Sequence, residues 1–74
     1  MNELQLLTGL GSRIREIRLK KGITQNELAN RCNFEKASMS RIESGRSNLT
    51  FRTMHKICKA LDIHITELFS PLNT

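Results

Sequence analysis

The chain has no tryptophan and no tyrosine, and phenylalanine occurs only three times in its 74 residues. Its core must therefore consist mainly of aliphatic side chains. A single proline and four glycines leave little scope for a fold of many short strands and turns. Because this length suits one small domain, we expect no separate catalytic or ligand-sensing domain.

Long apolar runs and closely spaced cysteines are also missing. The apolar cluster of Leu4, Leu6 and Leu7 is too short for a signal peptide or a membrane span. Cys32 and Cys58 lie far apart, each at an apolar position of an expected helix, so we expect two buried thiols and no disulfide. Together these features favour a cytoplasmic location.

Basic residues outnumber acidic ones. Lysine and arginine total 12 against seven aspartate and glutamate residues, which gives a formal net charge of +5. Such a charge favours a polyanionic partner, either nucleic acid or an anionic membrane surface. The membrane is the poorer match, because the basic residues are spread over several expected helices instead of one amphipathic face.

Apolar residues recur at helical spacing, and no segment alternates with a period of two residues. The sequence therefore predicts an all-α fold with five helices. We assign the domain to residues 10–70, with a flexible arm at residues 1–9 and a tail at residues 71–74. The expected helices cover about residues 10–21, 25–32, 35–44, 51–61 and 65–69.

The second and third expected helices have clear boundaries. Thr24 and Glu27 have the spacing of a capping box at the start of the second helix. Asn33 is suited to the left-handed conformation that would end it, and Glu35 can accept amide hydrogen bonds at the start of the third. Two helices joined by so few residues form a helix-turn-helix.

The third helix has two different faces on a helical wheel. Met39 and Ile42 define the side that faces the core. The opposite side is small, polar and basic, as a helix that enters the major groove must be, although an ordinary solvated face would look the same. Its residues are Lys36, Ala37, Ser38, Ser40, Arg41 and Ser44.

Glu43 lies on the buried side of the same wheel. A buried carboxylate without a cation is costly, so it requires a basic partner. Arg18 shares a face of the first helix with Ile14 and Ile17. We therefore predict an Arg18–Glu43 ion pair that fixes the angle between the first and third helices.

Three motifs resemble those of the lambda-repressor and Cro family, also called the Xre family. They are T-Q-x-E-L-A at residues 24–29, S-R-I-E-x-G at residues 40–45 and K-A-L at residues 59–61. The resemblance extends over about residues 10–70. It implies a five-helix DNA-binding domain that uses the second and third helices as a helix-turn-helix.

The resemblance also implies roles for individual residues. The base-reading positions correspond to Lys36, Ala37, Ser38, Ser40 and Arg41. The positions that hold DNA phosphates correspond to Thr24, Gln25, Ser44, Arg46 and Asn48. Many relatives have proline where this chain has Leu49, and the base-reading positions vary within the family, so the resemblance does not give the operator sequence.

The C-terminal segment is more apolar than one short helix in so small a domain requires. We interpret it partly as local core and partly as a two-fold dimer interface, formed by Ile63, Ile65, Leu68, Phe69 and Leu72. Two linked copies about 34 Å apart would read a palindromic operator with useful specificity. The expected protein is a homodimeric transcriptional regulator that binds double-stranded DNA.

Other functions fit less well. No Ser-His-acid or Cys-His arrangement has catalytic spacing, so we expect no enzyme activity. His55, Cys58 and His64 lack a second pair at zinc spacing, and we expect no metal, cofactor or small-molecule ligand. The main alternative is an antitoxin or a restriction–modification controller-type protein, which would regulate its own gene and bind a partner protein.

Overall fold

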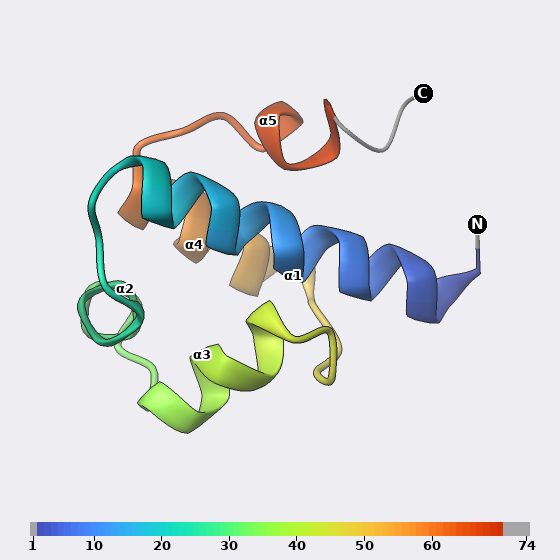
Figure 1. Cartoon of the computed structure of the whole chain (residues 1–74), viewed down its shortest axis with the longest axis horizontal. Coiled ribbons are helices and arrows are strands. Elements are labelled where there is room, and N and C mark those ends of the chain that lie inside the picture. Colours follow the sequence, from blue (N-terminus) through green and yellow to red (C-terminus); the bar gives the residue numbers. More distant parts are fainter. Residues whose placement is uncertain (1, 71–74) are drawn as a thin grey trace.

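The longest helix, α1 (Glu3–Lys20), crosses the whole molecule in the computed structural model, which describes residues 2–70 (Figure 1). The four shorter helices are α2 (Gln25–Cys32), α3 (Lys36–Glu43), α4 (Phe51–Leu61) and α5 (Thr66–Phe69). Helix α1 packs against α2, α3 and α5, and α2 packs against α3 and α4. The described residues contain no strand, and the predicted all-α fold with five helices is confirmed.

The start of α1 differs from the prediction. The arm expected over residues 1–9 is helical from Glu3 onward, so the expected start near Leu10 is wrong. Asn2 caps the helix: its side chain accepts a hydrogen bond from the Gln5 amide at 2.8 Å, and the Gln5 side chain accepts one from the Asn2 amide at 3.1 Å. This capping box satisfies amides that would otherwise have no partner at the helix start.

Asn2→Ala is expected to lower the free energy of unfolding by about 0.5–1 kcal/mol, because the Gln5 amide loses its acceptor. The effect should be local, with faster hydrogen exchange at residues 4–6 measured by NMR. Asn30→Ala changes an exposed asparagine within α2 and should leave those amides unaffected. Unchanged exchange in Asn2→Ala would show that this capping box does not hold the first turn.

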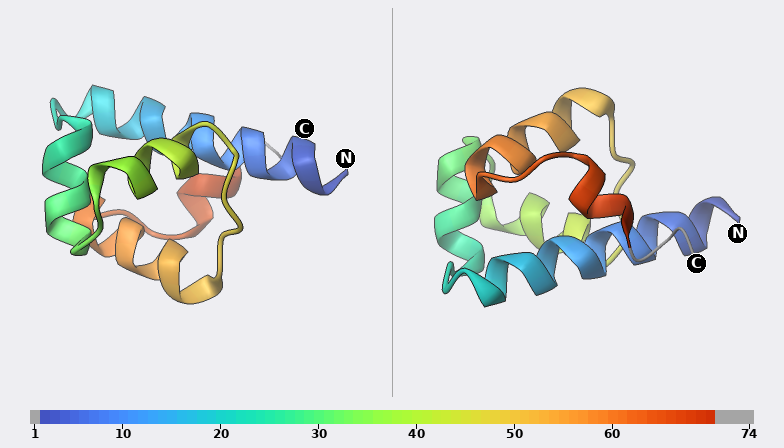
Figure 2. Two further views of the ribbon diagram at one scale, coloured as in Figure 1. Left: turned by 90° about the horizontal axis from the view of Figure 1, so that it is seen from below. Right: turned by 90° about the horizontal axis from the view of Figure 1, so that it is seen from above.

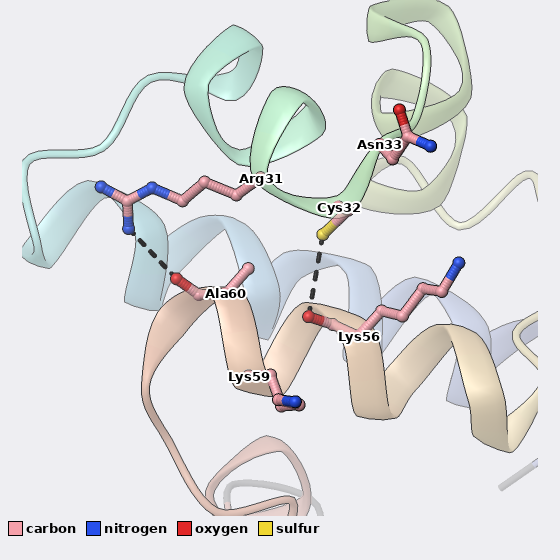
Figure 3. A pocket seen from close by; sticks show the side chains of 6 residues that line it. All are labelled: Arg31, Cys32, Asn33, Lys56, Lys59 and Ala60. Atoms are coloured by element: carbon pink, nitrogen blue, oxygen red, sulfur yellow. Dashed lines mark hydrogen bonds between the residues drawn. The ribbon is translucent and has the colours of Figure 1, made fainter.

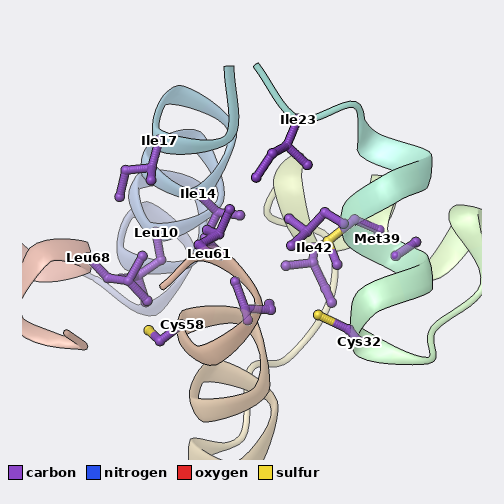
Figure 4. Close-up of a cluster of buried hydrophobic side chains, with 13 residues drawn as sticks. Leu10, Ile14, Ile17, Ile23, Cys32, Met39, Ile42, Cys58, Leu61 and Leu68 are labelled. Atoms are coloured by element: carbon purple, nitrogen blue, oxygen red, sulfur yellow. The ribbon is translucent and has the colours of Figure 1, made fainter. Parts of the chain in front are cut away.

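The core lies between all five helices and is largely aliphatic (Figure 4). Its completely buried large side chains are Ile14, Leu28, Met39, Ile57, Leu61 and Leu68. Cys32 and Cys58 are also buried, and both thiols are free, as the sequence predicted. Burial raises the pKa of both thiols; the charge of Lys56 opposes this shift at Cys32, and that of Glu67 adds to it at Cys58.

A close approach of α1 to the end of α3 depends on glycine. A Cβ atom at Gly11 would meet the backbone carbonyl oxygens of Ile42 and Glu43. Gly45, which follows α3, has φ +77° and lies against the backbone of Thr8. These two glycines let α1 fix the position of α3 and of the loop after it.

No helix within residues 2–70 is both long enough and apolar enough to span a lipid bilayer.

Candidate nucleic-acid interface

Helices α2 and α3 form the helix-turn-helix that the sequence predicted. Thr24 caps α2 by accepting a hydrogen bond from the Glu27 amide at 3.0 Å, and Glu27 accepts one from the Thr24 amide at 3.1 Å. The bond from the Thr24 amide to the Glu27 carboxylate, together with the Thr24 side chain, lowers the pKa of Glu27. Asn33 ends α2 in the left-handed conformation with φ 60°, and α3 begins three residues later. The backbone of Glu35 occupies the N-cap of α3, but its side chain accepts no hydrogen bond there, contrary to expectation.

The two faces of α3 are divided as the helical wheel indicated. Met39, Ile42 and Glu43 are buried on the side of α1 and α2. The predicted base-reading side chains lie on the other side, where Ser40 is half-buried and the rest are exposed: Lys36, Ala37, Ser38 and Arg41. Because no large apolar side chain projects from this face, it can approach base edges closely.

The buried ion pair that the sequence predicted is present beneath this face. Arg18 donates from Nε to one Glu43 carboxylate oxygen at 2.8 Å and from Nη2 to the other at 3.0 Å. Its Nη1 donates to the carbonyl oxygen of Ile23 at 2.8 Å. Each of the two charged residues is only 6% exposed. This two-pronged contact joins α1 to the last turn of α3 and so sets the orientation of α3.

The predicted phosphate-binding residues lie at two ends of the helix-turn-helix. Gln25, half-buried at the start of α2, donates to Glu43 Oε1 at 3.2 Å, while Thr24 is exposed beside it. At the other end, Arg46 Nε donates to Ser44 Oγ at 2.9 Å, and that hydroxyl donates to the Arg41 carbonyl oxygen at 3.1 Å. Asn48 follows in the same loop and is exposed. Gln25 and Ser44 line the same hollow together with Glu43, so the two groups approach each other in space beside the C-terminal end of α3.

Arg15 joins this surface, although the sequence analysis did not select it. A shallow hollow of about 260 Å³ opens between α1, α2 and α3, and its lining residues are Arg15, Gln25, Ser40, Glu43 and Ser44. The paired Arg18 compensates the charge of Glu43 in this hollow. Arg15 lies three residues before Arg18, one helical turn away on the same side of α1, and this spacing could have identified it.

The residues of the apolar C-terminal segment differ in burial, and one of them does not fit the predicted dimer interface. Leu68 is completely buried in the core of its own chain, so it is not available to a partner, and its assignment to a dimer interface is wrong. Ile63, Ile65 and Phe69 are half-buried and keep some exposed surface, and Leu72 lies outside the described residues. Arg13 donates to the Glu67 carbonyl oxygen at 2.9 Å and ties α5 to α1, which explains how Leu68 is held inside.

Comparison with known proteins gives the family of this fold. The HTH_3 helix-turn-helix family model matches residues 14–68. The chain is 36% identical over 62 residues to the uncharacterized HTH-type transcriptional regulator y4dJ of Sinorhizobium fredii. This alignment covers 84% of this chain and 80% of that protein.

Two solved structures of restriction-modification controller proteins are similar to this chain. C.AhdI from Aeromonas hydrophila has a TM-score of 0.82 and 35% sequence identity, over 85% of this chain and 96% of that one. C.Esp1396I, solved as a tetramer in complex with its natural 35 base-pair operator, has a TM-score of 0.81 and 36% identity, over 90% of this chain and 88% of that one. The similarity therefore extends over nearly the full length of these small proteins.

Proposed function

The chain belongs to the HTH_3 family of helix-turn-helix proteins, and from this premise we propose that it is a sequence-specific DNA-binding transcriptional regulator, homodimeric on a palindromic operator. The observation that carries the proposal is the exposed face of α3, which is small and basic and has the hydrogen-bond donors Gln25 and Ser44 beside its C-terminal end. Because the proposed partner is DNA, we propose that the protein is located in the cytoplasm.

In the proposed complex, the exposed face of α3 enters the major groove. Arg41 can donate two hydrogen bonds to a guanine, Lys36 can reach guanine acceptors, and the methyl group of Ala37 can contact a thymine methyl. Ser38 and Ser40 are small enough to bond to either bases or backbone. These contacts would carry the sequence specificity.

Phosphate contacts would fix the position of α3 in the groove. Gln25 at the start of α2 would hold one strand, where the backbone amides and the helix dipole also favour an anion. Ser44, Arg46 and Asn48 would hold phosphates beside the end of α3 and the loop that follows it. Such contacts carry little sequence information, but they supply much of the affinity and make it fall with salt.

We place the proposed homodimer interface at the half-exposed part of the C-terminal segment. There Ile63, Ile65 and Phe69 keep some exposed apolar surface. The C.Esp1396I structure, a tetramer on its operator, supports assembly on DNA by a protein of this size and fold. A dimer with two recognition helices about 34 Å apart would read two half-sites.

Selection of bound duplexes from random DNA tests the proposed function. We expect enrichment of a palindrome whose half-sites are about 10 base pairs apart, centre to centre, with affinity that falls steeply between 50 and 200 mM salt. Light scattering on the free protein tests the dimer separately. Recovery of unenriched sequences would contradict sequence-specific binding, and enrichment of a single half-site would contradict the palindrome.

A controller-type role is the second candidate, and the similarity to C.AhdI favours it. A controller of this kind would bind the promoter region of its own gene. Sequencing of the flanking genes and a footprint on the DNA upstream of this gene would distinguish it from a regulator of distant genes. An antitoxin role would instead require a complex with the product of a neighbouring gene.

Arg15→Gln is expected to weaken binding about tenfold, equally on the selected operator and on unrelated DNA, because a charge-assisted phosphate contact is lost. The salt slope of the affinity should become shallower by about one unit per lost contact. Lys20→Gln removes the same charge from an exposed position elsewhere on α1 and serves as the control. Equal effects of the two variants would contradict a role for Arg15 beyond net charge.

A further inference from the structure

A second basic surface lies along α4. Arg52, His55, Lys56 and Lys59 follow the i, i+3, i+4, i+7 spacing and share one exposed side of this helix, which we call the α4 ridge. The opposite side is buried through Ile57, Cys58 and Leu61. No residue of α4 is acidic, so the ridge carries positive charge along its whole length. None of its residues takes part in the DNA contacts proposed above.

The C-terminal half of the ridge borders a hollow of about 380 Å³ between α2 and α4 (Figure 3). Its lining residues are Arg31, Cys32, Asn33, Lys56, Lys59 and Ala60. Three of these side chains are cationic, one is an amide, and none is a carboxylate. The hollow includes no residue of α3, in contrast to the smaller hollow that Arg15 lines.

Contacts within the chain hold two of the three cations in place. Arg31 donates from Nη1 to the Ala60 carbonyl oxygen at 3.1 Å, and Lys56 Nζ lies 5.6 Å from the centre of the Phe34 ring. Across the floor of the hollow, the Cys32 thiol lies 3.8 Å from the Lys56 carbonyl oxygen (Figure 3). Because these contacts favour one arrangement of the two side chains, binding an anion here should cost less conformational entropy than at lysines without such contacts.

None of the cations of this surface forms an ion pair within the described residues. The ion pairs among residues 2–70 are Arg13–Glu16 and Arg18–Glu43, and both lie away from the ridge. A hollow lined by three cations and no carboxylate is complementary to carboxylates or phosphates. Both proteins and nucleic acids carry such anions, so the other side chains of this surface decide which class of partner fits it.

An exposed aromatic pair at the N-terminal end of α4 favours a protein. Phe51 is 69% exposed and stacks on His55, with ring centroids 6.5 Å apart and planes 5° from parallel. Exposed aromatic and arginine side chains side by side are typical of protein interfaces. Figure 1 shows α4 behind α1 and α3 below it, and both views of Figure 2 show α3 and α4 as separate helices, so the two helices occupy different parts of the molecule.

We propose that the α4 ridge and the hollow beside it bind an acidic helix of a partner protein. The matching helix would carry glutamate or aspartate at i, i+4 and i+7, opposite Arg52, Lys56 and Lys59, and an apolar side chain that covers Phe51. One carboxylate would enter the hollow between Arg31 and Lys59. The proposal goes beyond DNA binding, because it gives a DNA-bound regulator a surface for a second macromolecule.

The test uses the full chain and a synthetic alanine-based helical peptide with one leucine and glutamates at i, i+4 and i+7. A second peptide of the same composition has the glutamates scattered around the helix. NMR titration of the isotope-labelled protein should give shifts at residues 31–33 and 51–60 with the first peptide. We expect Lys56→Gln/Lys59→Gln to weaken this binding about fivefold, since two exposed ion pairs are lost.

The matched control is Lys20→Gln/Lys21→Gln, which removes the same charge from exposed positions at the end of α1. It should bind the peptide like the unmodified protein, and both double variants should bind an operator duplex equally. Equal peptide binding by the two double variants, or equal binding of the two peptides, would overturn the proposal. So would a duplex affinity lower in Lys56→Gln/Lys59→Gln than in the control, because the ridge would then belong to the DNA surface.

Discussion

Replacing Glu43 with alanine is expected to lower the free energy of unfolding by about 3–5 kcal/mol, the largest stability effect we anticipate for a single substitution. The substitution leaves Arg18, a residue only 6% exposed, without the carboxylate that accepts two of its hydrogen bonds. Gln25 loses an acceptor as well. Every buried side-chain nitrogen and oxygen within residues 2–70 currently has a partner, so the variant would introduce an uncompensated charge into a satisfied core.

This loss is large compared with the total stability of such a domain. Folded domains are stable by about 5–15 kcal/mol, and one of this size lies toward the lower end. Glu43→Ala should therefore be partly or largely unfolded at 25 °C. Urea denaturation followed by circular dichroism measures the change, and added DNA should not restore the full helical signal at micromolar concentrations.

Two further variants separate a buried pair from an exposed one. Glu16→Ala removes the partner of Arg13 at the surface, where solvent screens the charges, and should leave the midpoint of denaturation nearly unchanged. Arg18→Met/Glu43→Leu replaces both buried charges with apolar side chains and should be more stable than Glu43→Ala. A Glu43→Ala protein as stable as Glu16→Ala would contradict the structural role of the pair.

The ion pair could be predicted because both of its requirements are visible in the sequence. A wheel places Glu43 beside Met39 and Ile42, and the cost of a buried charge then demands a cation such as Arg18. The boundaries of α2 were predictable for a similar reason, since the capping residues and the left-handed Asn33 act through local geometry. Local patterns therefore accounted for the helix-turn-helix and for the two faces of α3.

The errors lie where local patterns do not decide the outcome. The first turns of α1 carry exposed Leu4 and Leu6, which give no amphipathic signal, and only the capping pair of Asn2 and Gln5 marks the true start of the helix. Leu68 fills the chain's own core, but an apolar pattern does not distinguish that core from the core of a dimer. Arg15 becomes part of the candidate DNA-binding surface only because three helices meet around one hollow, and that arrangement depends on the tertiary fold.

Arg41→Ala is expected to produce the largest change in DNA recognition. A pair of hydrogen bonds from arginine to guanine discriminates against the wrong base by about 1–3 kcal/mol, and a dimer would lose this twice. The fold should survive, because the side chain is exposed and its backbone carbonyl, which accepts from Ser44 and the Arg46 amide, is unchanged. The variant should lose preference at one base pair of each half-site.

Repeating the selection from random DNA with Arg41→Ala measures this change position by position. Arg46→Ala is the matched comparison, since it removes an arginine from the loop after α3, where we expect a phosphate contact. That variant should bind all sequences more weakly, keep the wild-type preference and show a shallower salt slope. If Arg41→Ala behaved in the same way, Arg41 would hold the backbone, and the reading of bases would fall to Lys36 and its neighbours at the start of α3.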